Sequence, residues 1–331
     1  MKKIGIIGFG NIGKNIYEKV KEKGWKVEFV INSKGVFPEK FSGIPEKESL
    51  DSFFRHGRYV DLVFLAIPTL DDGKIAKNYI DLFIKNGIPV VTCEKGALSN
   101  YFIKLKPHLS RVGFSATVGG GSGMIQFLQQ RFSSGTREVH TVLNGTLNYI
   151  WDDLKMGNPL GHIVEEITKL GYTEPGKSDP YDIILREVGS DTTKKASILF
   201  NLCFNSKRNL QAKDIVVTIS PETIIQAINE AMMRRFVVSF EKQEYFRQES
   251  DSISAFKCLI DGWIITGGFK RTDRNPLIAR LCNSTTWVNN AILTVEGDSG
   301  ADGVYICGGP GAGASPTSAA MIRDAERLLL K

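Results

Sequence analysis

Short apolar runs alternate with amphipathic stretches along the first hundred residues. An apolar run at residues 3–7 precedes a glycine-rich turn, a helical pattern follows to about residue 23, and a second apolar run covers residues 26–31. The alternation continues with an apolar run at 61–67, a helical stretch at about 73–85 and an apolar run at 88–92. Repeated alternation of strand and helix predicts a parallel, doubly wound α/β sheet of the Rossmann type.

The pattern changes after about residue 135. A strand is predicted at 138–143 and long helices near 160–170 and 190–206, followed by Thr-rich and Val-rich runs. This mixture predicts a second, α+β domain. No Pro-rich or Ser-rich linker separates the two patterns, so the change of pattern alone sets the expected first domain at residues 1–135.

The composition is that of a folded protein with two cores. A chain of 331 residues with 42% hydrophobic and 24% charged residues is long enough for two domains. The net charge of +6 comes from lysines mixed with acidic residues, so no basic stripe indicates a nucleic-acid partner. Because no apolar run has the length of a membrane span or the position of a signal peptide, we expect a cytoplasmic protein without a membrane partner.

Motifs for metals and for nucleophilic triads are missing from the sequence. The five cysteines have no C-x-x-C spacing, and the four histidines are isolated from one another. We therefore expect free thiols, structural or exposed histidines and no metal site. The histidines are His56, His108, His140 and His162.

The glycine-rich turn after the first strand predicts a dinucleotide site. Its G-x-G-x-x-G spacing has meaning here because it stands between a predicted strand and a predicted helix. Gly8 permits the tight turn, Gly10 lets the backbone approach a pyrophosphate, and Gly13 allows close packing of the helix. Amides at the helix start attract the anion. The expected cofactor contacts are Gly8, Phe9, Gly10, Asn11, Ile12 and Gly13.

The end of the second predicted strand bears on the choice of cofactor. NAD-binding turns commonly have an acidic residue there, whereas this chain has Asn32, Ser33 and Lys34. A carboxylate repels a ribose phosphate, while Ser33 and Lys34 are able to bind one, so these residues favour NADP over NAD. Two alternatives stay open: Lys34 is a solvated loop residue, or both cofactors bind.

Several further segments share the residue pattern of one enzyme family. They are 90–96 (VVTCEKG), 116–121 (ATVGGG), 143–150 (LNGTLNYI), 171–175 (GYTEP), 191–195 (DTTKK) and 309–317 (GPGAGASPT). In order and approximate spacing these segments resemble the homoserine dehydrogenase family, and the resemblance covers nearly the whole chain. The eight residues at 143–150 are its most specific part.

The resemblance implies an activity and an assembly. It implies interconversion of aspartate semialdehyde and homoserine with NAD(P), by a homodimer. It also implies that segment 304–331 returns to the dinucleotide-binding domain, which leaves 136–303 for substrate binding and dimerisation. The site residues that it implies are Lys195 and Lys95 for catalysis, Glu174, Asp191, Gly145 and Thr146 for the substrate, and Lys95 and Gly311 for the cofactor.

The chemistry of two of these residues agrees with the resemblance. Asp191 and Lys195 stand at positions i and i+4, so one helix face presents both. Hydride transfer to an aldehyde develops negative charge on its oxygen, which a nearby ammonium stabilises and protonates. We expect Lys195 to be this acid, with Lys95 as a second cation that makes its proton easier to release. The alternative is an ordinary surface ion pair.

The sequence also departs from the family pattern. Glu94 stands where the family has an asparagine, and Ser115 stands where many members have a glutamate that helps to hold a monovalent cation. We therefore assign no metal, although the carbonyl groups of Val118 and Gly120 remain available as ligands. The interval between Glu174 and Asp191 is longer than usual, and its acidic residues are left unassigned.

These departures keep two other functions open. One is another dehydrogenase of the same two-domain plan, acting on a different amino or oxo acid. The other is a nucleotide-binding sensor without turnover. The presence of both Lys95 and Lys195 argues against the sensor, because a sensor has no need of a proton donor.

Overall fold

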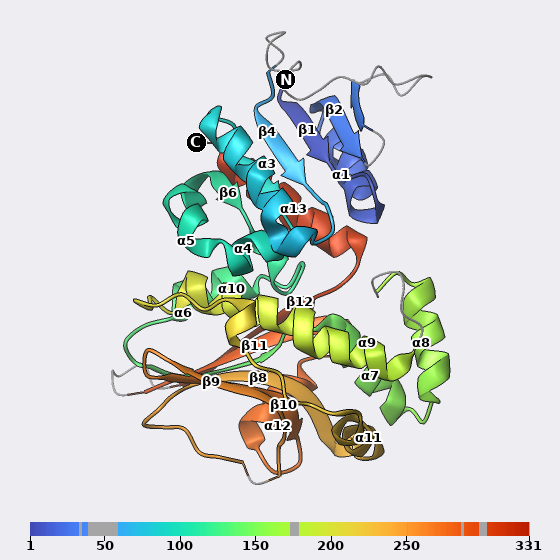
Figure 1. The fold of residues 1–331 in the computed structure, drawn as a ribbon, viewed down its shortest axis with the longest axis vertical. Coiled ribbons are helices and arrows are strands. Elements are labelled where there is room, and N and C mark those ends of the chain that lie inside the picture. Colours follow the sequence, from blue (N-terminus) through green and yellow to red (C-terminus); the bar gives the residue numbers. More distant parts are fainter. Residues whose placement is uncertain are drawn as a thin grey trace. The chain divides into compact units, whose positions relative to one another are not determined.

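The computed structural model describes residues 1–32, 35–38, 59–172, 179–249, 251–285, 288–297 and 303–330. The chain divides into two units (Figure 1). The first comprises Met1–Gly120 together with Ala314–Lys331, and the second comprises Gly121–Gly313. The first unit is therefore built from both ends of the chain.

The first unit contains a six-stranded sheet in the order β3-β2-β1-β4-β5-β6. β2, β1, β4, β5 and β6 pair in parallel, and β3 pairs antiparallel with β2 at the edge. The sheet confirms the predicted Rossmann-type domain. Its strands are β1 (Lys3–Ile7), β2 (Lys26–Asn32), β3 (Gly35–Pro38), β4 (Leu62–Leu65), β5 (Val90–Thr92) and β6 (Val112–Gly113), and its helices are α1 (Asn11–Glu22), α3 (Lys74–Lys85), α4 (Gly96–Asn100), α5 (Phe102–Leu105) and α13 (Ala314–Leu329).

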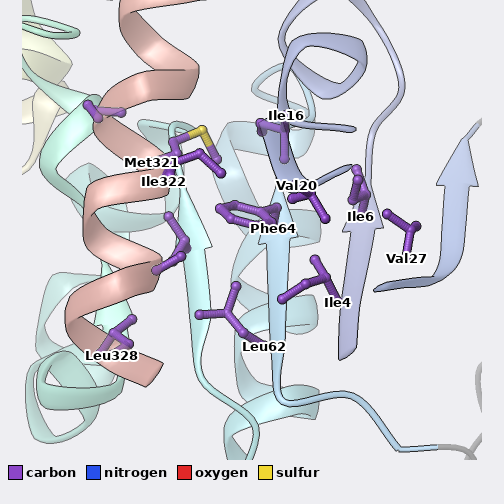
Figure 2. Packing of buried hydrophobic residues seen from close by; sticks show 14 of the residues in the cluster. Ile4, Ile6, Ile16, Val20, Val27, Leu62, Phe64, Met321, Ile322 and Leu328 are labelled. Atoms are coloured by element: carbon purple, nitrogen blue, oxygen red, sulfur yellow. The ribbon is translucent and has the colours of Figure 1, made fainter. Parts of the chain in front are cut away.

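One face of this sheet packs against α1 and the C-terminal helix α13. Figure 2 shows Met321 and Ile322 of α13 beside Phe64 of β4, with Ile16 of α1 across the same layer. All four belong to one cluster of buried apolar side chains. The last helix of the chain therefore completes the core of the first unit.

The opposite face packs against α3. The ring of Phe83 on α3 stacks with that of Phe29 on β2, with centroids 6.4 Å apart. Phe29 also lies over Gly5 of β1, where a Cβ atom would stand only 2.3 Å from the phenylalanine ring. A side chain at position 5 would displace this ring, so the packing of α3 requires glycine there.

The second unit contains a six-stranded sheet in the order β12-β11-β7-β8-β10-β9, and its pairings are antiparallel. This sheet and its helices confirm the predicted α+β architecture. The strands are β7 (Thr136–Val142), β8 (Arg234–Lys242), β9 (Ile253–Ile260), β10 (Trp263–Arg271), β11 (Asn289–Glu296) and β12 (Gly303–Pro310). The helices are α6 (Met124–Arg131), α7 (Gly145–Lys155), α8 (Leu160–Lys169), α9 (Pro180–Arg186), α10 (Thr193–Cys203), α11 (Pro221–Asn229) and α12 (Pro276–Asn283).

Helices cover both faces of this second sheet (Figure 1). On one face, Ile278 and Leu281 of α12 pack against Val142, Val237 and neighbouring apolar side chains of the strands. On the other face, Trp151 of α7 stacks on the ring of Phe269, with centroids 4.4 Å apart. Trp151 is therefore a core residue of the second unit.

The division between the units differs from the expected boundaries at residues 135 and 303. Helix α6 lies in the second unit because it packs against α10 and β11. β12 also lies in the second unit, because its residues from Gly303 to Pro310 pair along the whole of β11. The segment that belongs to the first unit near the C-terminus therefore begins at Ala314, where α13 starts.

None of the helices in the described ranges is both long enough and apolar enough to cross a bilayer.

The role of α13 in the first core leads to a stability prediction. Met321 is fully buried among strands and α1, so Met321→Ala should lower the free energy of unfolding by about 2–5 kcal/mol. Leu330, which follows the same helix and is 88% exposed, provides the control, because Leu330→Ala should change that energy by less than about 0.5 kcal/mol. Urea unfolding of the three proteins measures both values. Equal stability of the two variants would show that α13 is dispensable for this core.

Candidate functional site

The glycine-rich turn joins β1 to α1 through three glycines with different surroundings. Gly8 has a φ of +91°, and a Cβ there would stand 2.2 Å from the carbonyl oxygen of Ala66. A Cβ at Gly13 would stand 2.0 Å from the carbonyl oxygen of Gly8. A Cβ at Gly10, by contrast, would meet no heavy atom within 4 Å. Gly8 and Gly13 thus close the turn, and Gly10 leaves open space beside the helix start.

The start of α1 has the features of an anion site. Gly10 is its N-cap residue, no side chain of the described residues caps the helix, and its first turn contains no acidic residue. Amides at such a terminus attract negative charge. The open space at Gly10 and the uncapped amides of Asn11 and Ile12 therefore fit a dinucleotide pyrophosphate. Phe9 packs edge-on against the ring of Tyr17 and so supports the turn from the side.

Of the three residues expected to select the cofactor, the structure describes only Asn32. Asn32 is the last residue of β2, where it pairs with Gly35 of β3. Ser33 and Lys34 lie outside the described residues. The preference for NADP therefore stays a prediction from sequence.

Lys95 stands at the N-cap of α4, directly after a buried carboxylate. One oxygen of Glu94 accepts hydrogen bonds from the Thr69 hydroxyl at 2.6 Å and from the Gly96 amide at 2.5 Å. The other oxygen accepts from the Ala97 amide at 2.8 Å. Glu94 therefore fixes the backbone on both sides of Lys95 and joins it to the loop after β4.

Ser115 is tied to the C-terminal helix. Its hydroxyl donates to Oδ1 of Asp324 at 2.6 Å, and its amide donates to Oδ2 at 2.8 Å. Asp324 lies on α13 and is only 4% exposed. The serine that departs from the family pattern thus has a structural partner within the same unit. The following turn contains Gly119 and Gly120, both with positive φ.

The segment at 143–150 forms the junction of β7 and α7. Asn144 is the N-cap of α7, and its Oδ1 accepts from the Leu147 amide at 2.8 Å. Gly145 is tightly enclosed, since a Cβ there would stand 2.9 Å from the carbonyl oxygen of Val288. The hydroxyl of Thr146 donates to the carbonyl oxygen of Tyr172 at 2.9 Å. This bond connects α7 with Tyr172, the last residue described before the gap at 173–178.

Gly311 lies in the second unit, beside this junction. Its amide donates to the carbonyl oxygen of Val288 at 2.9 Å, and a Cβ at this position would stand 2.2 Å from the Asn290 side chain. Close packing against Asn290 thus requires glycine. Its expected contact with the cofactor stays a prediction.

Lys195 and Asp191 form a largely buried ion pair. The Lys195 Nζ lies 2.6 Å from Oδ2 of Asp191, and the two side chains are 11% and 19% exposed. Asp191 belongs to a π-helical turn, Glu187–Thr192, that continues into α10. This low exposure does not fit the alternative of a solvated surface pair. Glu174, the other expected substrate ligand, lies outside the described residues.

Two further residues belong to this cluster and were not expected from the sequence. Nδ2 of Asn144 donates to Oδ2 of Asp191 and to Oε2 of Glu187, at 2.9 Å in each case. Burial and the charge of Asp191 raise the pKa of Glu187 to about 7. Asn144 belongs to the segment 143–150, and Glu187 precedes Asp191 by one helical turn, so both positions are visible in the sequence as candidates for this cluster.

His140 lies in a different polar cluster of the second sheet. Its Nδ1 is 2.7 Å from the Ser239 hydroxyl and its Nε2 is 2.9 Å from Oε2 of Glu138. The hydrogen bond with His140 lowers the pKa of Glu138. Although the three side chains have the order of a hydrolytic triad, Ser239 is fully buried within β8 and has no access for a substrate. The cluster is a polar element of the sheet.

Comparison with known families gives a clear match. The family model described as homoserine dehydrogenase matches residues 124–325, which is more than half of the chain. The chain belongs to the homoserine dehydrogenase family. This confirms the family that the sequence motifs predict.

Relatives match over most of the chain at low identity. The bifunctional aspartokinase/homoserine dehydrogenase 2, chloroplastic, of Zea mays is 25% identical over 98% of this chain. This chain spans 38% of the length of that relative. A homoserine dehydrogenase of Sulfurisphaera tokodaii is 24% identical over 64% of this chain and 71% of its own length.

Solved structures have the same fold. A homoserine dehydrogenase from Thermoplasma acidophilum has a TM-score of 0.71 at 18% identity, covering 100% of this chain and 99% of its own. A hyperthermophilic archaeal homoserine dehydrogenase in complex with NADPH has a TM-score of 0.68 at 20% identity, covering 100% and 98%. At these identities the likeness concerns the fold.

The contacts of Glu94 lead to a prediction about the backbone around Lys95. Glu94 accepts three hydrogen bonds through its carboxylate oxygens. In Glu94→Gln an NH₂ group replaces one of these oxygens, so at least one of the three groups that now donate to Glu94 would face another donor. A buried donor without an acceptor costs about 1–3 kcal/mol, and we expect the free energy of unfolding to fall by that amount. Chemical unfolding measures it. The exposed Glu22→Gln of α1 is the control and should leave stability unchanged, whereas equal stability of both variants would contradict this role of Glu94.

Proposed function

We propose that the protein interconverts L-aspartate 4-semialdehyde and L-homoserine with a nicotinamide dinucleotide. The observation that carries the proposal is the largely buried pair of Lys195 and Asp191, with 2.6 Å between its charged atoms, in a chain that belongs to the homoserine dehydrogenase family. A buried ammonium on a rigid helix is suited to donate a proton at a defined place.

Each residue of the proposed site has a chemical task. In the reducing direction the aldehyde carbon receives a hydride, which is the chemistry that a reduced nicotinamide supplies. The carbonyl oxygen takes a proton from the Lys195 ammonium, and in the oxidising direction neutral Lys195 accepts it back. Asp191 holds this ammonium in place. Lys95 provides a second positive charge for the reaction, and Glu174 with Asp191 provides negative charge for the amino group of homoserine.

The cofactor site of the proposal is the turn of β1 and α1. Gly10 and the first amides of α1 would hold the pyrophosphate, because the turn has open space there and the helix has no side-chain cap among the described residues. Binding of NADPH by the archaeal relative supports a nicotinamide dinucleotide as the cofactor. Ser33 and Lys34 support NADP over NAD.

We also propose the assembly from the family resemblance and the cellular compartment from the hydrophobic pattern of the sequence. The expected assembly is a homodimer formed through the second unit, and the expected compartment is the cytoplasm. Light scattering of the purified protein measures the first, and fractionation of the source cells measures the second.

The proposed activity is tested by following nicotinamide absorbance with homoserine and with aspartate semialdehyde. Wild-type protein should turn over, and Lys195→Ala should lower kcat by about 10²–10⁴-fold, the usual effect of losing a general acid–base group. The adjacent Lys194 bonds to the Ser190 hydroxyl, so Lys194→Ala is the matched control and should keep nearly full activity. Turnover of a different oxo acid, with none of homoserine, would favour the other dehydrogenase, and absence of all turnover would favour the sensor.

Cofactor preference is tested by a change at Lys34. Lys34→Ala should weaken NADP binding by about tenfold and leave NAD binding nearly unchanged, because only NADP has a 2′-phosphate to lose a charged contact. Titration of protein fluorescence with each cofactor gives the two dissociation constants. Equal losses for both cofactors would show that Lys34 does not contact the phosphate.

A further inference from the structure

Glu187 is a buried carboxyl group that the proposed reaction does not use. It begins the π-helical turn between α9 and α10 and is only 7% exposed. The Asn144 amide connects it to Asp191, and Asp191 in turn pairs with Lys195. An unbroken chain of short polar contacts therefore runs from Glu187 to the proposed proton donor.

The orientation of the Asn144 amide in this chain is fixed. Its oxygen accepts the Leu147 amide as the cap of α7, so its nitrogen must face the two carboxyl groups. Oε2 of Glu187 and Oδ2 of Asp191 each lie 2.9 Å from that nitrogen. Two carboxyl oxygens around one donor are close enough to repel each other when both are charged.

The neighbouring charges decide which of the two carboxyl groups takes up a proton. Nζ of Lys195 lies 2.6 Å from Oδ2 of Asp191, whereas Nη2 of Arg186 lies 3.7 Å from Oε1 of Glu187. Burial and the Asp191 charge raise the pKa of Glu187, while the Asn144 bond, Lys195 and Arg186 oppose the rise. These neighbours come from α7, α9, the π-helical turn and α10. Burial and the Asp191 charge outweigh the opposing contacts and leave the pKa of Glu187 raised, to about 7.

We propose that Glu187 is a positioning residue whose proton sets the charge next to Lys195. With Glu187 protonated, the cluster presents one carboxylate to the Lys195 ammonium. With Glu187 ionised it presents two, and the ammonium form of Lys195 is favoured. The inference rests on the proposed function, in which Lys195 exchanges a proton with the substrate oxygen.

A titration by infrared spectroscopy tests the proton on Glu187 without any substrate. Ordinary carboxyl groups are ionised at about pH 6, so a carbonyl stretch of a protonated carboxyl that is present there and lost by about pH 8 belongs to a group with a raised pKa. The difference between wild type and Glu187→Gln separates Glu187 from Glu241, whose pKa burial also raises. The exposed Glu165→Gln is the control and should keep the wild-type spectrum. Identical spectra of wild type and Glu187→Gln would overturn the proposal.

The connection to Lys195 is tested by its reaction with an amine-acylating reagent, measured by peptide mass against pH. Glu187→Gln removes a negative neighbour, so Lys195 should lose its proton more readily and its labelling profile should move to lower pH by about 1 unit. The profile of Glu165→Gln should match wild type, and Glu187→Asp, which keeps a carboxyl group, should restore part of the shift. An unmoved profile in Glu187→Gln would overturn the connection. Should this variant not fold, the wild-type infrared titration and Glu187→Asp still decide the proposal.

The pH profile of homoserine oxidation completes the test. Neutral Lys195 is the form that accepts a proton in this direction, so the rising limb of kcat should move to lower pH in Glu187→Gln by about the same 1 unit as the labelling profile. The KM for homoserine should stay within about twofold, since no substrate contact is removed. A loss of turnover in every protein, with the labelling shift intact, would refute the proposed function and leave the role of Glu187 standing.

Discussion

The side chain of Asn144 connects three parts of the second unit. Its oxygen caps the N-terminus of α7, shortly after β7 ends at Val142, and its nitrogen donates to Glu187 and Asp191. Because an amide has one accepting and one donating end, these contacts can be made in only one orientation. Replacement of Asn144 by an apolar residue would remove the helix cap and a donor to two buried carboxyl groups together, at about 1–3 kcal/mol each. The place of Lys195 depends on this residue, because Asp191 holds the ammonium.

The two parts of the proposed site use the same element, a junction from strand to helix, in opposite ways. At the junction of β1 and α1, glycine replaces a capping side chain, and the amides of the helix start face the open space at Gly10. At the junction of β7 and α7, Asn144 occupies the corresponding place and satisfies the helix start itself. The first arrangement suits an anionic ligand, since the amides need an acceptor. The second satisfies the helix start without a ligand and directs the amide nitrogen toward Glu187 and Asp191.

The sequence predicted those parts of the molecule that depend on local pattern. The apolar run before Gly8 became β1 at Lys3–Ile7, and the helical spacing at about 73–85 became α3 at Lys74–Lys85. The cluster at Lys195 was predicted only as the pair with Asp191, whose spacing along a helix is visible in sequence. Glu187 stands one helical turn before Asp191, which is a local signal, but its link to the cluster runs through Asn144, 43 residues earlier, and no local pattern encodes that contact. The unit boundary near Gly120 likewise depends on distant contacts, since the packing of α6 on α10 and β11 assigns that helix to the second unit.

The two residues that depart from the family pattern, Ser115 and Glu94, both have hydrogen-bond partners within the first unit. A glutamate at position 115 would set a second carboxylate against Asp324, which is 4% exposed. Ser115 avoids that repulsion and donates both its hydroxyl and its amide to the same aspartate. Glu94 likewise accepts three hydrogen bonds with its two carboxylate oxygens. An asparagine has a single accepting oxygen, so it would have to accept all three bonds there or leave some of the donors without a partner. Both replacements therefore change how the backbone near the proposed site is held, and neither removes Lys95, Lys195 or Asp191, the charged groups on which the proposed chemistry rests.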